Sequence, residues 1–327
     1  MKAILRIAVL VAIVTGLGTI VHAQQTAKIA RVGFLTASDP KTLASRLESF
    51  RQGLRDLGYF EGKNMVLEIR WAEGKRERLP LLAAELERMK MDVIVTGGPS
   101  ATRGAKQGTS RTPIVMALDG DPVGSGFVAS LARPGGNITG LSTLSLEVSA
   151  KQIDILRQVM PGLARVSVLG DSKEPGNGRA LQETERAARM AGLQIHYVDR
   201  RAAQELDDAF QAMRKERAEA VVVLPTPMST AERARVAALA SIHRLPAIYP
   251  WPDFVDVGGL LTYSVNIEDL YRRAASYVDK ILKGSKPADL PVEQPYKFEL
   301  VINLRAAKEI GLVIPTSVLT RADRVVQ

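Results

Sequence analysis

The chain has 327 residues, of which 46% are hydrophobic, 24% charged and 5% aromatic, a composition typical of a globular protein of about two domains. It contains no cysteine, which excludes disulfides, thiolate zinc sites, iron–sulfur clusters and thiol nucleophiles. The net charge is +9, but basic residues alternate with acids, as in 75–78 and 214–217. Because no basic stripe interleaved with aromatic residues occurs, we expect no nucleic-acid partner.

The first 23 residues have the form of a secretory signal peptide. Lys2 and Arg6 precede an apolar stretch over residues 7–21, and the small residue Ala23 offers a cleavage site. We therefore expect cleavage after Ala23 and export to the periplasm. An uncleaved anchor is the alternative, because the apolar stretch is slightly shorter than the roughly 20 residues that span a membrane.

From residue 31 onward, short β-branched runs alternate with amphipathic stretches. Strands are predicted at 31–36, 65–70, 92–96, 113–117 and 138–141. Between the first two strands, apolar residues recur at steps of three and four, which predicts a helix with one apolar face; they are Leu43, Leu47, Phe50, Leu54 and Leu57. A strand, a helix and a second strand in succession form the unit of a parallel sheet.

The same pattern restarts after the turn-rich segment 132–137. Helices are predicted at 147–160, 179–191, 203–217 and 230–244, and strands at 165–169, 194–198, 220–224 and 246–249. The last third is too short for a third lobe. It contributes a strand at 260–263, a helix at 267–282, a Pro-rich crossing at 284–295, a strand at 299–302 and a helix at 304–311.

This order predicts an α/β fold with two open parallel-sheet lobes joined by a multi-segment hinge. The predicted lobes are residues 28–143 with 265–290 and residues 144–264 with 291–327. Three segments, near Thr143, Ser264 and Pro291, should cross between the lobes. Closure about these points would bury a ligand between the two lobes.

Motifs of common hydrolases, metalloproteases and phosphate-binding loops are absent from the sequence. His196 lies within a predicted strand and His243 near a helix end, and neither has a second ligand at metal spacing, so ordinary structural roles are expected for both. We expect no metal, no cofactor and no enzymatic activity. The alternative is a hydrolase or isomerase that uses a carboxylate pair such as Asp119 and Asp121, which would require convergent side chains with shifted pKa values.

The segment DPVGSGFVASLARPGGNITGLS at 121–142 closely resembles the exported substrate-binding proteins of ABC transporters, a family with tryptophan- and tyrosine-binding-like members. Similar stretches, from about Ile29 to the C-terminus, occur at 50–59, 61–64, 71–74, 245–249, 270–274, 277–284 and 297–303. The resemblance implies the type I periplasmic binding protein fold. It also implies a receptor that captures a small solute and presents it to an inner-membrane ABC permease. A sensor kinase or chemoreceptor is the alternative partner, and we expect a monomer.

Ligands of open parallel sheets bind at the carboxyl ends of the strands. This rule selects twelve candidate ligand-binding residues: Thr36, Ser38, Gly97, Gly98, Ser100, Asp119 and Ser142 on the first lobe, and Asp171, Asn177, Thr226, Tyr249 and Tyr263 on the second.

Each candidate has a chemical and a structural interpretation. Gly97 and Gly98 would let backbone amides at a helix start meet a ligand carboxylate, to which Ser38 could add a hydroxyl. Asp119 and Asp171 are candidates for a ligand ammonium. Tyr249, Trp251 and Tyr263 could stack on an apolar ligand body. The structural alternatives are a plain strand-to-helix turn, helix caps for the aspartates and, for Trp251, packing at the hinge. An amino acid or a similar small zwitterion is the expected ligand.

Overall fold

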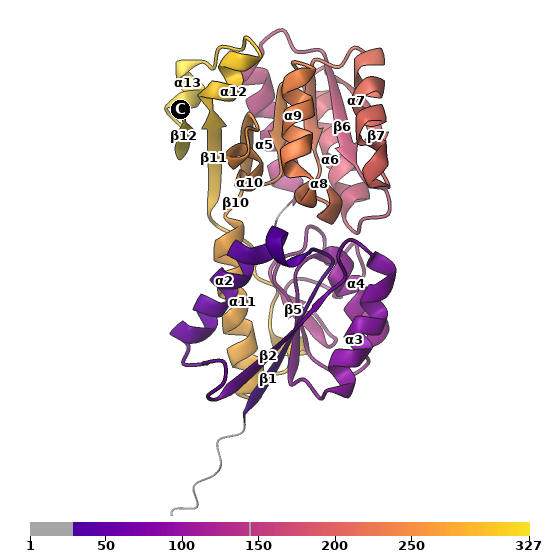
Figure 1. Ribbon diagram of the computed structural model, residues 1–327, viewed down its shortest axis with the longest axis vertical. Helices are drawn as coiled ribbons and strands as arrows, with labels where there is room; N and C mark the ends of the chain where they lie inside the picture. Colours follow the sequence, from indigo (N-terminus) through magenta and orange to yellow (C-terminus); the bar gives the residue numbers. More distant parts are fainter. Residues whose placement is uncertain (1–28, 144) are drawn as a thin grey trace, which may run out of the picture.

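The computed structural model describes residues 29–143 and 145–327, which form two α/β lobes stacked along the long axis of the molecule (Figure 1). The predicted signal peptide lies outside the described residues. Each lobe is built on its own sheet. We call the lobe that begins the chain the N-lobe and the other the C-lobe.

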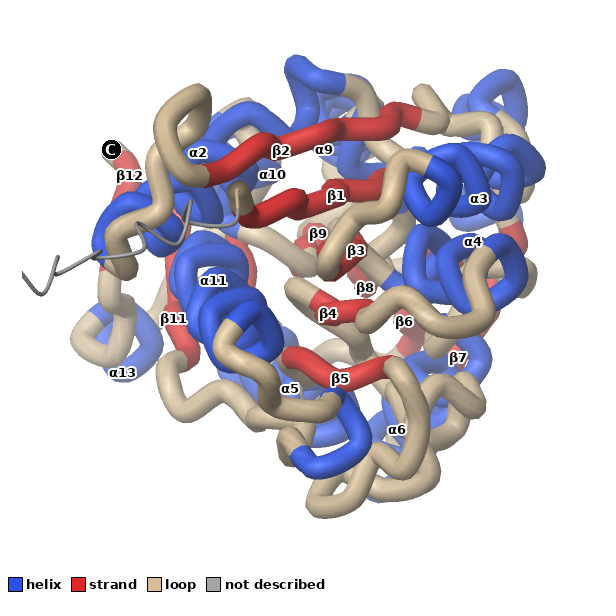
Figure 2. The backbone as a smooth tube through the Cα atoms, turned by 90° about the horizontal axis from the view of Figure 1, so that it is seen from below, coloured by secondary structure: helices blue, strands red, loops and turns tan. Residues whose placement is uncertain are grey.

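The N-lobe contains a five-stranded parallel sheet in the order β2-β1-β3-β4-β5. Its strands are β1 (Ala30–Thr36), β2 (Met65–Trp71), β3 (Val93–Thr96), β4 (Ile114–Met116) and β5 (Ile138–Gly140). Its helices are α2 (Pro40–Asp56), α3 (Leu79–Arg88), α4 (Pro99–Gly108) and α11 (Ile267–Leu282), with a 3-10 turn at Arg76–Arg78. The helices α2 and α11 cover one face of the sheet, and α3 and α4 cover the other (Figure 2).

Helix α2 begins where the sequence provides a cap. The side chain of Asp39 accepts a hydrogen bond from the backbone N–H of Thr42 at 2.9 Å, and Pro40 occupies the first helical position. The apolar face then packs on β1, with Phe50 and Phe34 5.6 Å apart between ring centroids. Helix α11 lies so close to α2 that a Cβ at Gly53 would lie 2.3 Å from the carbonyl oxygen of Arg272. The pairing of α2 with α11 therefore depends on a glycine.

The C-lobe contains a seven-stranded sheet in the order β12-β11-β10-β9-β8-β6-β7. Its strands are β6 (Arg165–Gly170), β7 (Gln194–Asp199), β8 (Ala220–Val223), β9 (Ala247–Tyr249), β10 (Leu261–Val265), β11 (Phe298–Asn303) and β12 (Arg324–Val326). One pairing differs from the expected parallel sheet, because β11 runs antiparallel to β10. Strand β10 ends at the junction with the N-lobe and β11 starts from it, so the two must run in opposite directions.

Eight helices and a few short turns cover this sheet in the described part of the C-lobe. They are α5 (Ser145–Val159), α6 (Asn177–Met190), α7 (Leu206–Lys215), α8 (Pro227–Ala231), α9 (Arg233–Ile242), α10 (Pro252–Asp256), α12 (Leu304–Glu309) and α13 (Thr316–Leu319), with 3-10 turns at Ala203–Glu205 and, beside the N-lobe, Pro287–Asp289. The single helix predicted at 230–244 is two helices, α8 and α9, which meet at Glu232. Helix α10 and strand β12 were not predicted, because five and three residues are too short to show a period.

The chain crosses between the lobes three times. The first crossing leads from Thr143 into α5, and the second leads from Val265 into α11. The third comes slightly later than the sequence suggested. Glu293 still lies along the edge of β5, where its N–H donates to Gly140 O at 2.9 Å and its carbonyl accepts from Ser142 N at 2.8 Å. The crossing therefore follows Glu293 rather than Pro291.

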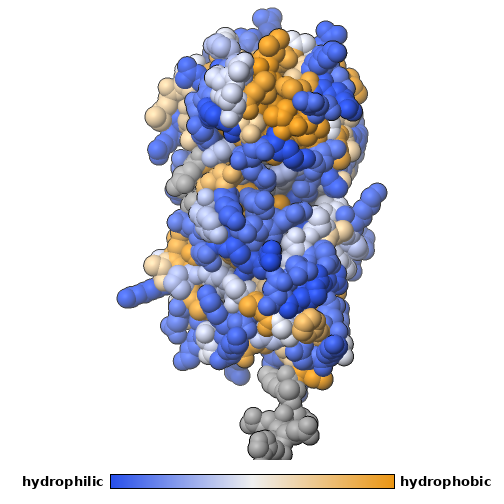
Figure 3. All heavy atoms as spheres, turned by 90° about the vertical axis from the view of Figure 1, so that its left-hand side faces the viewer, coloured by the Kyte–Doolittle hydropathy of each residue, from blue (hydrophilic) through white to orange (hydrophobic). Residues whose placement is uncertain are grey.

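Apolar packing continues from one lobe into the other. One buried cluster contains Phe34 and Tyr271 of the N-lobe, Phe210 and Phe254 of the C-lobe, and Trp251 at the junction. On the face seen in Figure 3, the belt between the lobes is mostly hydrophilic, whereas apolar residues gather on the upper lobe. Among the helices of residues 29–143 and 145–327, none has both the length and the apolar character that crossing a bilayer requires.

Candidate functional site

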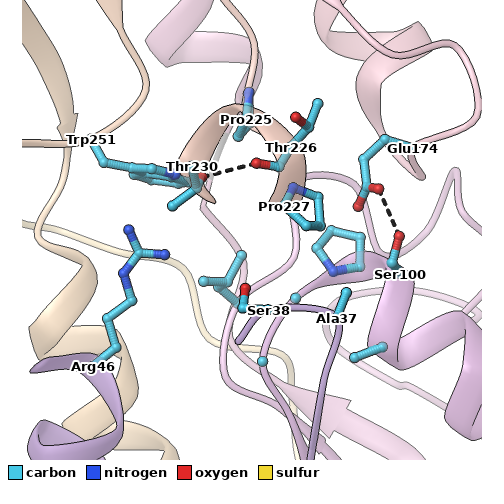
Figure 4. A pocket seen from close by; sticks show the side chains of 15 residues that line it. Ala37, Ser38, Arg46, Ser100, Glu174, Pro225, Thr226, Pro227, Thr230 and Trp251 are labelled. Atoms are coloured by element: carbon cyan, nitrogen blue, oxygen red, sulfur yellow. Dashed lines mark hydrogen bonds between the residues drawn. The ribbon is translucent and has the colours of Figure 1, made fainter. Parts of the chain in front are cut away.

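A cavity lies between the lobes, where strand ends of the two sheets face each other. It measures about 470 Å³ and is open to solvent. The N-lobe lines it with Ala37, Ser38, Arg46, Gly97, Gly98, Pro99, Ser100, Ala101 and Leu118, and the C-lobe with Glu174, Pro225, Thr226, Pro227, Thr230 and Trp251 (Figure 4). Two further cavities, of about 430 and 370 Å³, share Pro225 and Trp251 with it.

The N-lobe wall is formed where β3 turns into α4. Gly98 has a φ of 138°, a value that residues with a side chain rarely adopt. A Cβ at Gly97 would lie 3.2 Å from the side chain of Thr36. The carbonyl of Gly97 accepts a hydrogen bond from the hydroxyl of Tyr271 on α11 at 3.1 Å. The two glycines therefore bring backbone close to the cavity, and α11 fixes their position.

Arg46 places a buried cation at the cavity. Its side chain is 6% exposed and pairs with Asp253 of α10, with 2.8 Å between Nη2 and Oδ2. Its guanidinium lies 5.7 Å from the ring centroid of Trp251. Both side chains line the cavity, with Arg46 below Trp251 in the view of Figure 4. The Nε–H of Arg46 has no hydrogen-bond partner among the described residues. This guanidinium therefore has one N–H donor, at Nε, that a ligand anion could use.

The C-lobe wall is rigid. Thr226 caps α8, because its hydroxyl accepts a hydrogen bond from Ser229 N at 2.9 Å, and its carbonyl accepts from Thr230 Oγ1 at 2.9 Å (Figure 4). Pro225 and Pro227 flank it, and proline fixes φ. Trp251 is likewise held between two prolines and is 7% exposed. The indole thus forms a fixed apolar surface for the body of a ligand.

Glu174 contributes a buried carboxylate at the other end of the cavity. Its Oε2 accepts hydrogen bonds from Ser100 Oγ at 2.6 Å and from Arg76 Nη1 at 3.3 Å, both from the N-lobe. Arg76 also forms an ion pair with the fully buried Asp171. Burial raises the pKa of Glu174 to about 7, although the hydrogen bond from Ser100 and the charge of Arg76 lower it. A pKa of about 7 means that Glu174 gains or loses its proton near neutral pH.

The structure places five of the twelve sequence-selected residues on the cavity wall: Ser38, Gly97, Gly98, Ser100 and Thr226. Asn177 lines an adjoining cavity, where its amide donates to Pro225 O at 2.9 Å. Asp171 is buried in the ion pair with Arg76 at the rim. These seven residues lie together at the junction of the lobes.

The other five residues do not line the cavity. Thr36 lies behind Gly97 and uses its hydroxyl to accept from Ser38 N, and Ser142 is buried beside β5. Tyr249 is fully buried and stacks on Phe254, with 5.0 Å between ring centroids. Tyr263 stacks on Phe298 of β11 at 5.9 Å. The strand-end rule selected residues at the edge of the sheets that borders the cavity, but it did not tell which side chains turn into the lobe interior.

Asp119, the fifth of these residues, does not form the carboxylate pair of the enzyme interpretation. Its Oδ1 accepts a hydrogen bond from Asp121 N at 2.9 Å, and its Oδ2 has no partner among the described residues. Burial raises the pKa of Asp119 to about 8. The carboxylate of Asp121 instead caps a turn by accepting from Gly124 N at 2.9 Å. The two carboxylates therefore do not converge on a common cleft.

The two charged residues of the cavity wall, Arg46 and Glu174, were missed by the sequence analysis. Arg46 had a detectable signal, since it falls three residues after Leu43 and one before Leu47, on the apolar face of a predicted helix. A charge on a core face usually has a buried partner. Glu174 had none, because it lies in a loop without periodicity. Among the described residues, no group of three or more His, Cys, Asp or Glu side chains could hold a metal ion.

A family model described as "ABC transporter substrate binding protein" matches residues 32–326. The chain belongs to this family. The tyrosine-binding protein of Clostridioides difficile is 22% identical over 286 residues, which cover 87% of this chain and 82% of that protein.

Solved structures agree with this assignment. A domain from Streptococcus pneumoniae in complex with L-Trp has a TM-score of 0.86 and 26% identity, covering 91% of this chain and 99% of that one. A conserved domain protein from Vibrio cholerae has a TM-score of 0.87 and 24% identity, covering 91% and 100%. The fold is that of the type I periplasmic binding proteins, as expected. The chain is thus a substrate-binding protein of an ABC transporter.

Proposed function

We propose that this protein is the exported receptor of an ABC importer and that it captures an aromatic or other small amino acid between its lobes. The observation that carries the proposal is a cavity whose wall comes from both lobes and combines a buried guanidinium, a buried carboxylate and a fixed indole. A zwitterion with an apolar side chain complements this wall. The names of the relatives, one tyrosine-binding and one solved with L-Trp, support the same class.

In the proposed binding mode, Arg46 and Trp251 contact different parts of the ligand. The ligand carboxylate takes the free Nε–H donor of Arg46, and the ligand side chain lies against Trp251. Closure of the lobes about the three crossing segments then removes the ligand from water, which strengthens each polar contact. The solute leaves chemically unchanged, since the function is capture rather than turnover.

A thermal-shift panel of the common L-amino acids tests the ligand class. A ligand at a hundred times its dissociation constant should stabilise the protein by about 2.7 kcal/mol, which raises the melting temperature by several degrees. Mass spectrometry of the recovered ligand should return its starting mass. If no amino acid shifts the melting temperature, the ligand class is wrong; if a new product accumulates, the protein is an enzyme.

Export and partner need separate tests. We propose that the first 23 residues direct the chain to the periplasm, where a monomer docks on an inner-membrane permease. Intact mass of the periplasmic protein should place the mature N-terminus at Gln24. Deletion of the gene should abolish uptake of the bound solute, whereas a purely sensory partner would leave uptake unchanged.

A further inference from the structure

The start of α4, which the sequence suggested as the seat of a ligand carboxylate, is already occupied by a carboxylate of the protein. Glu174 of the C-lobe accepts from the hydroxyl of Ser100, in the first turn of α4, at 2.6 Å. A second carboxylate at this point would meet like charge in a buried site. The ligand's negative end therefore does not belong here, and the question is what Glu174 itself binds.

The charges around Glu174 do not balance. Arg76 is the cation of the group and pairs with both Asp171 and Glu174, whose side chains are 0% and 2% exposed. Asp119, which follows the neighbouring strand β4 of the N-lobe, lies close enough that the charge of Glu174 helps to raise the pKa of Asp119. Arg103 contacts the C-lobe only through the carbonyl of Lys173, at 3.5 Å. Arg201 also acts on Asp171, but it forms its own ion pair with Asp199. With Glu174 ionised, Arg76 is therefore the one cation among the described residues that pairs with these two buried carboxylates, and a buried charge without a counter-charge is costly.

The orientation of Glu174 gives the missing cation a place. Figure 4 shows Glu174 on the cavity wall, with one carboxylate oxygen bonded to Ser100 and the other turned toward the cavity, while Arg46 lies on the far side. The backbone N–H of Ser100 also acts on this carboxylate, but each carboxylate oxygen has two lone pairs, so the oxygen turned toward the cavity can also accept from an N–H donor of the solute. An ammonium group at this position would restore the charge balance of the cluster.

We propose that Glu174 binds the cationic amine of the solute and that the same carboxylate, through Ser100 and Arg76, holds the two lobes closed around it. This inference rests on the proposed function and names the positive end of the ligand. Glu174 is then the residue that selects amines. A solute that lacks the amine leaves the ionised carboxylate unbalanced in the closed form, and such a site rejects the analogue strongly.

The test compares each amino acid with its deamino analogue by titration calorimetry at pH 8. L-tryptophan is paired with 3-(indol-3-yl)propanoate, and L-tyrosine with 3-(4-hydroxyphenyl)propanoate. The wild-type protein should prefer the amino acid by at least about 30-fold, as expected when one partner of a buried charge pair is absent. Glu174→Gln should reduce this preference to about threefold or less without weakening the analogue. The control Glu77→Gln removes an exposed carboxylate next to Arg76 and should keep the wild-type preference.

The outcomes distinguish a failure of this inference from a failure of the proposed function. If Glu174→Gln keeps the wild-type preference, Glu174 does not bind the amine, while the proposed function stands. If neither pair binds the wild-type protein, the proposal of an aromatic amino acid fails and this inference fails with it. Should Glu174→Gln not fold, the wild-type preference measured at pH 8 and pH 5.5 decides: it should fall at the lower pH, and an unchanged preference overturns the proposal.

Discussion

Arg46 of the N-lobe and Asp253 of the C-lobe form an ion pair across the junction, with 2.8 Å between Nη2 and Oδ2. At the other end of the cavity, Arg76 pairs with Asp171 of the C-lobe. The cavity is thus bordered at both ends by ion pairs whose partners belong to different lobes. Separation of the lobes at the cavity would therefore have to break both ion pairs.

Arg46→Met should weaken binding of the amino acid ligand by about ten- to a hundredfold, because hydrogen bonds to a charged group contribute about 1.5–3 kcal/mol. The measurement is titration calorimetry. Arg51→Met is the matched control, since Arg51 lies on the same helix and pairs with Glu61 on the surface, where ion pairs contribute little. Equal affinity of wild type and Arg46→Met would remove Arg46 from the binding site.

Unliganded protein should close as the pH falls from 8 to 5.5. Closure buries Glu174 beside Asp171, Asp119 and Arg76, and burial raises the pKa of Glu174 to about 7 from the usual 4.5. The closed form thus binds the proton of Glu174 more tightly than the open form does. Closure therefore becomes more favourable as the pH falls from about 7 toward 4.5. Small-angle X-ray scattering should show a smaller radius of gyration at pH 5.5. Glu174→Gln should be compact at both pH values, and a pH response retained in that variant would contradict the assignment.

Tyr249→Ala should destabilise the fold by about 3–5 kcal/mol, because removal of a fully buried aromatic ring leaves a cavity against Phe254. Urea unfolding measures this loss. Tyr249→Phe keeps the stacked ring and should bind the ligand within about twofold of wild type, which titration calorimetry checks. The sequence analysis instead gave Tyr249 a place against the ligand, which would make a change at Tyr249 weaken binding. A tenfold loss of affinity in Tyr249→Phe would restore that expectation.

Tyr249 also illustrates what the sequence could predict. Periodicity located the parallel strands and the long helices, and the order of elements predicted two lobes with several crossings. Five of the residues that the strand-end rule selected as ligand-binding line the cavity: Ser38, Gly97, Gly98, Ser100 and Thr226. The strand-end rule does not distinguish alternate residues of a strand, which point to opposite faces of the sheet. Tyr249 and Tyr263 therefore satisfied the rule, although their side chains pack against Phe254 and Phe298 inside the lobe. Glu174 could not be found, because a loop residue becomes part of the site only when the lobes meet.

Gly53→Ala should cost several kcal/mol of stability, because the added Cβ would lie 2.3 Å from a backbone oxygen of α11, where neither helix can yield easily. Gly178→Ala is the matched control. Gly178 lies in the first turn of α6 with nothing within 4 Å of a Cβ, so that substitution should be neutral or stabilise by up to about 1 kcal/mol. Thermal unfolding compares the two, and equal melting temperatures would mean that the contact between α2 and α11 relaxes freely.

The pairing of α2 with α11 also has a consequence for biogenesis. Helix α2 ends at Asp56 and α11 begins at Ile267, so strands β6 to β10 of the C-lobe are synthesised before the apolar face of α2 can meet α11. Contacts between such distant segments form late, and until then an uncovered apolar face invites aggregation. An early-terminated chain that ends before α11 would therefore expose this face permanently. The N-lobe can therefore complete its fold only after the chain has been synthesised as far as Leu282 at the end of α11.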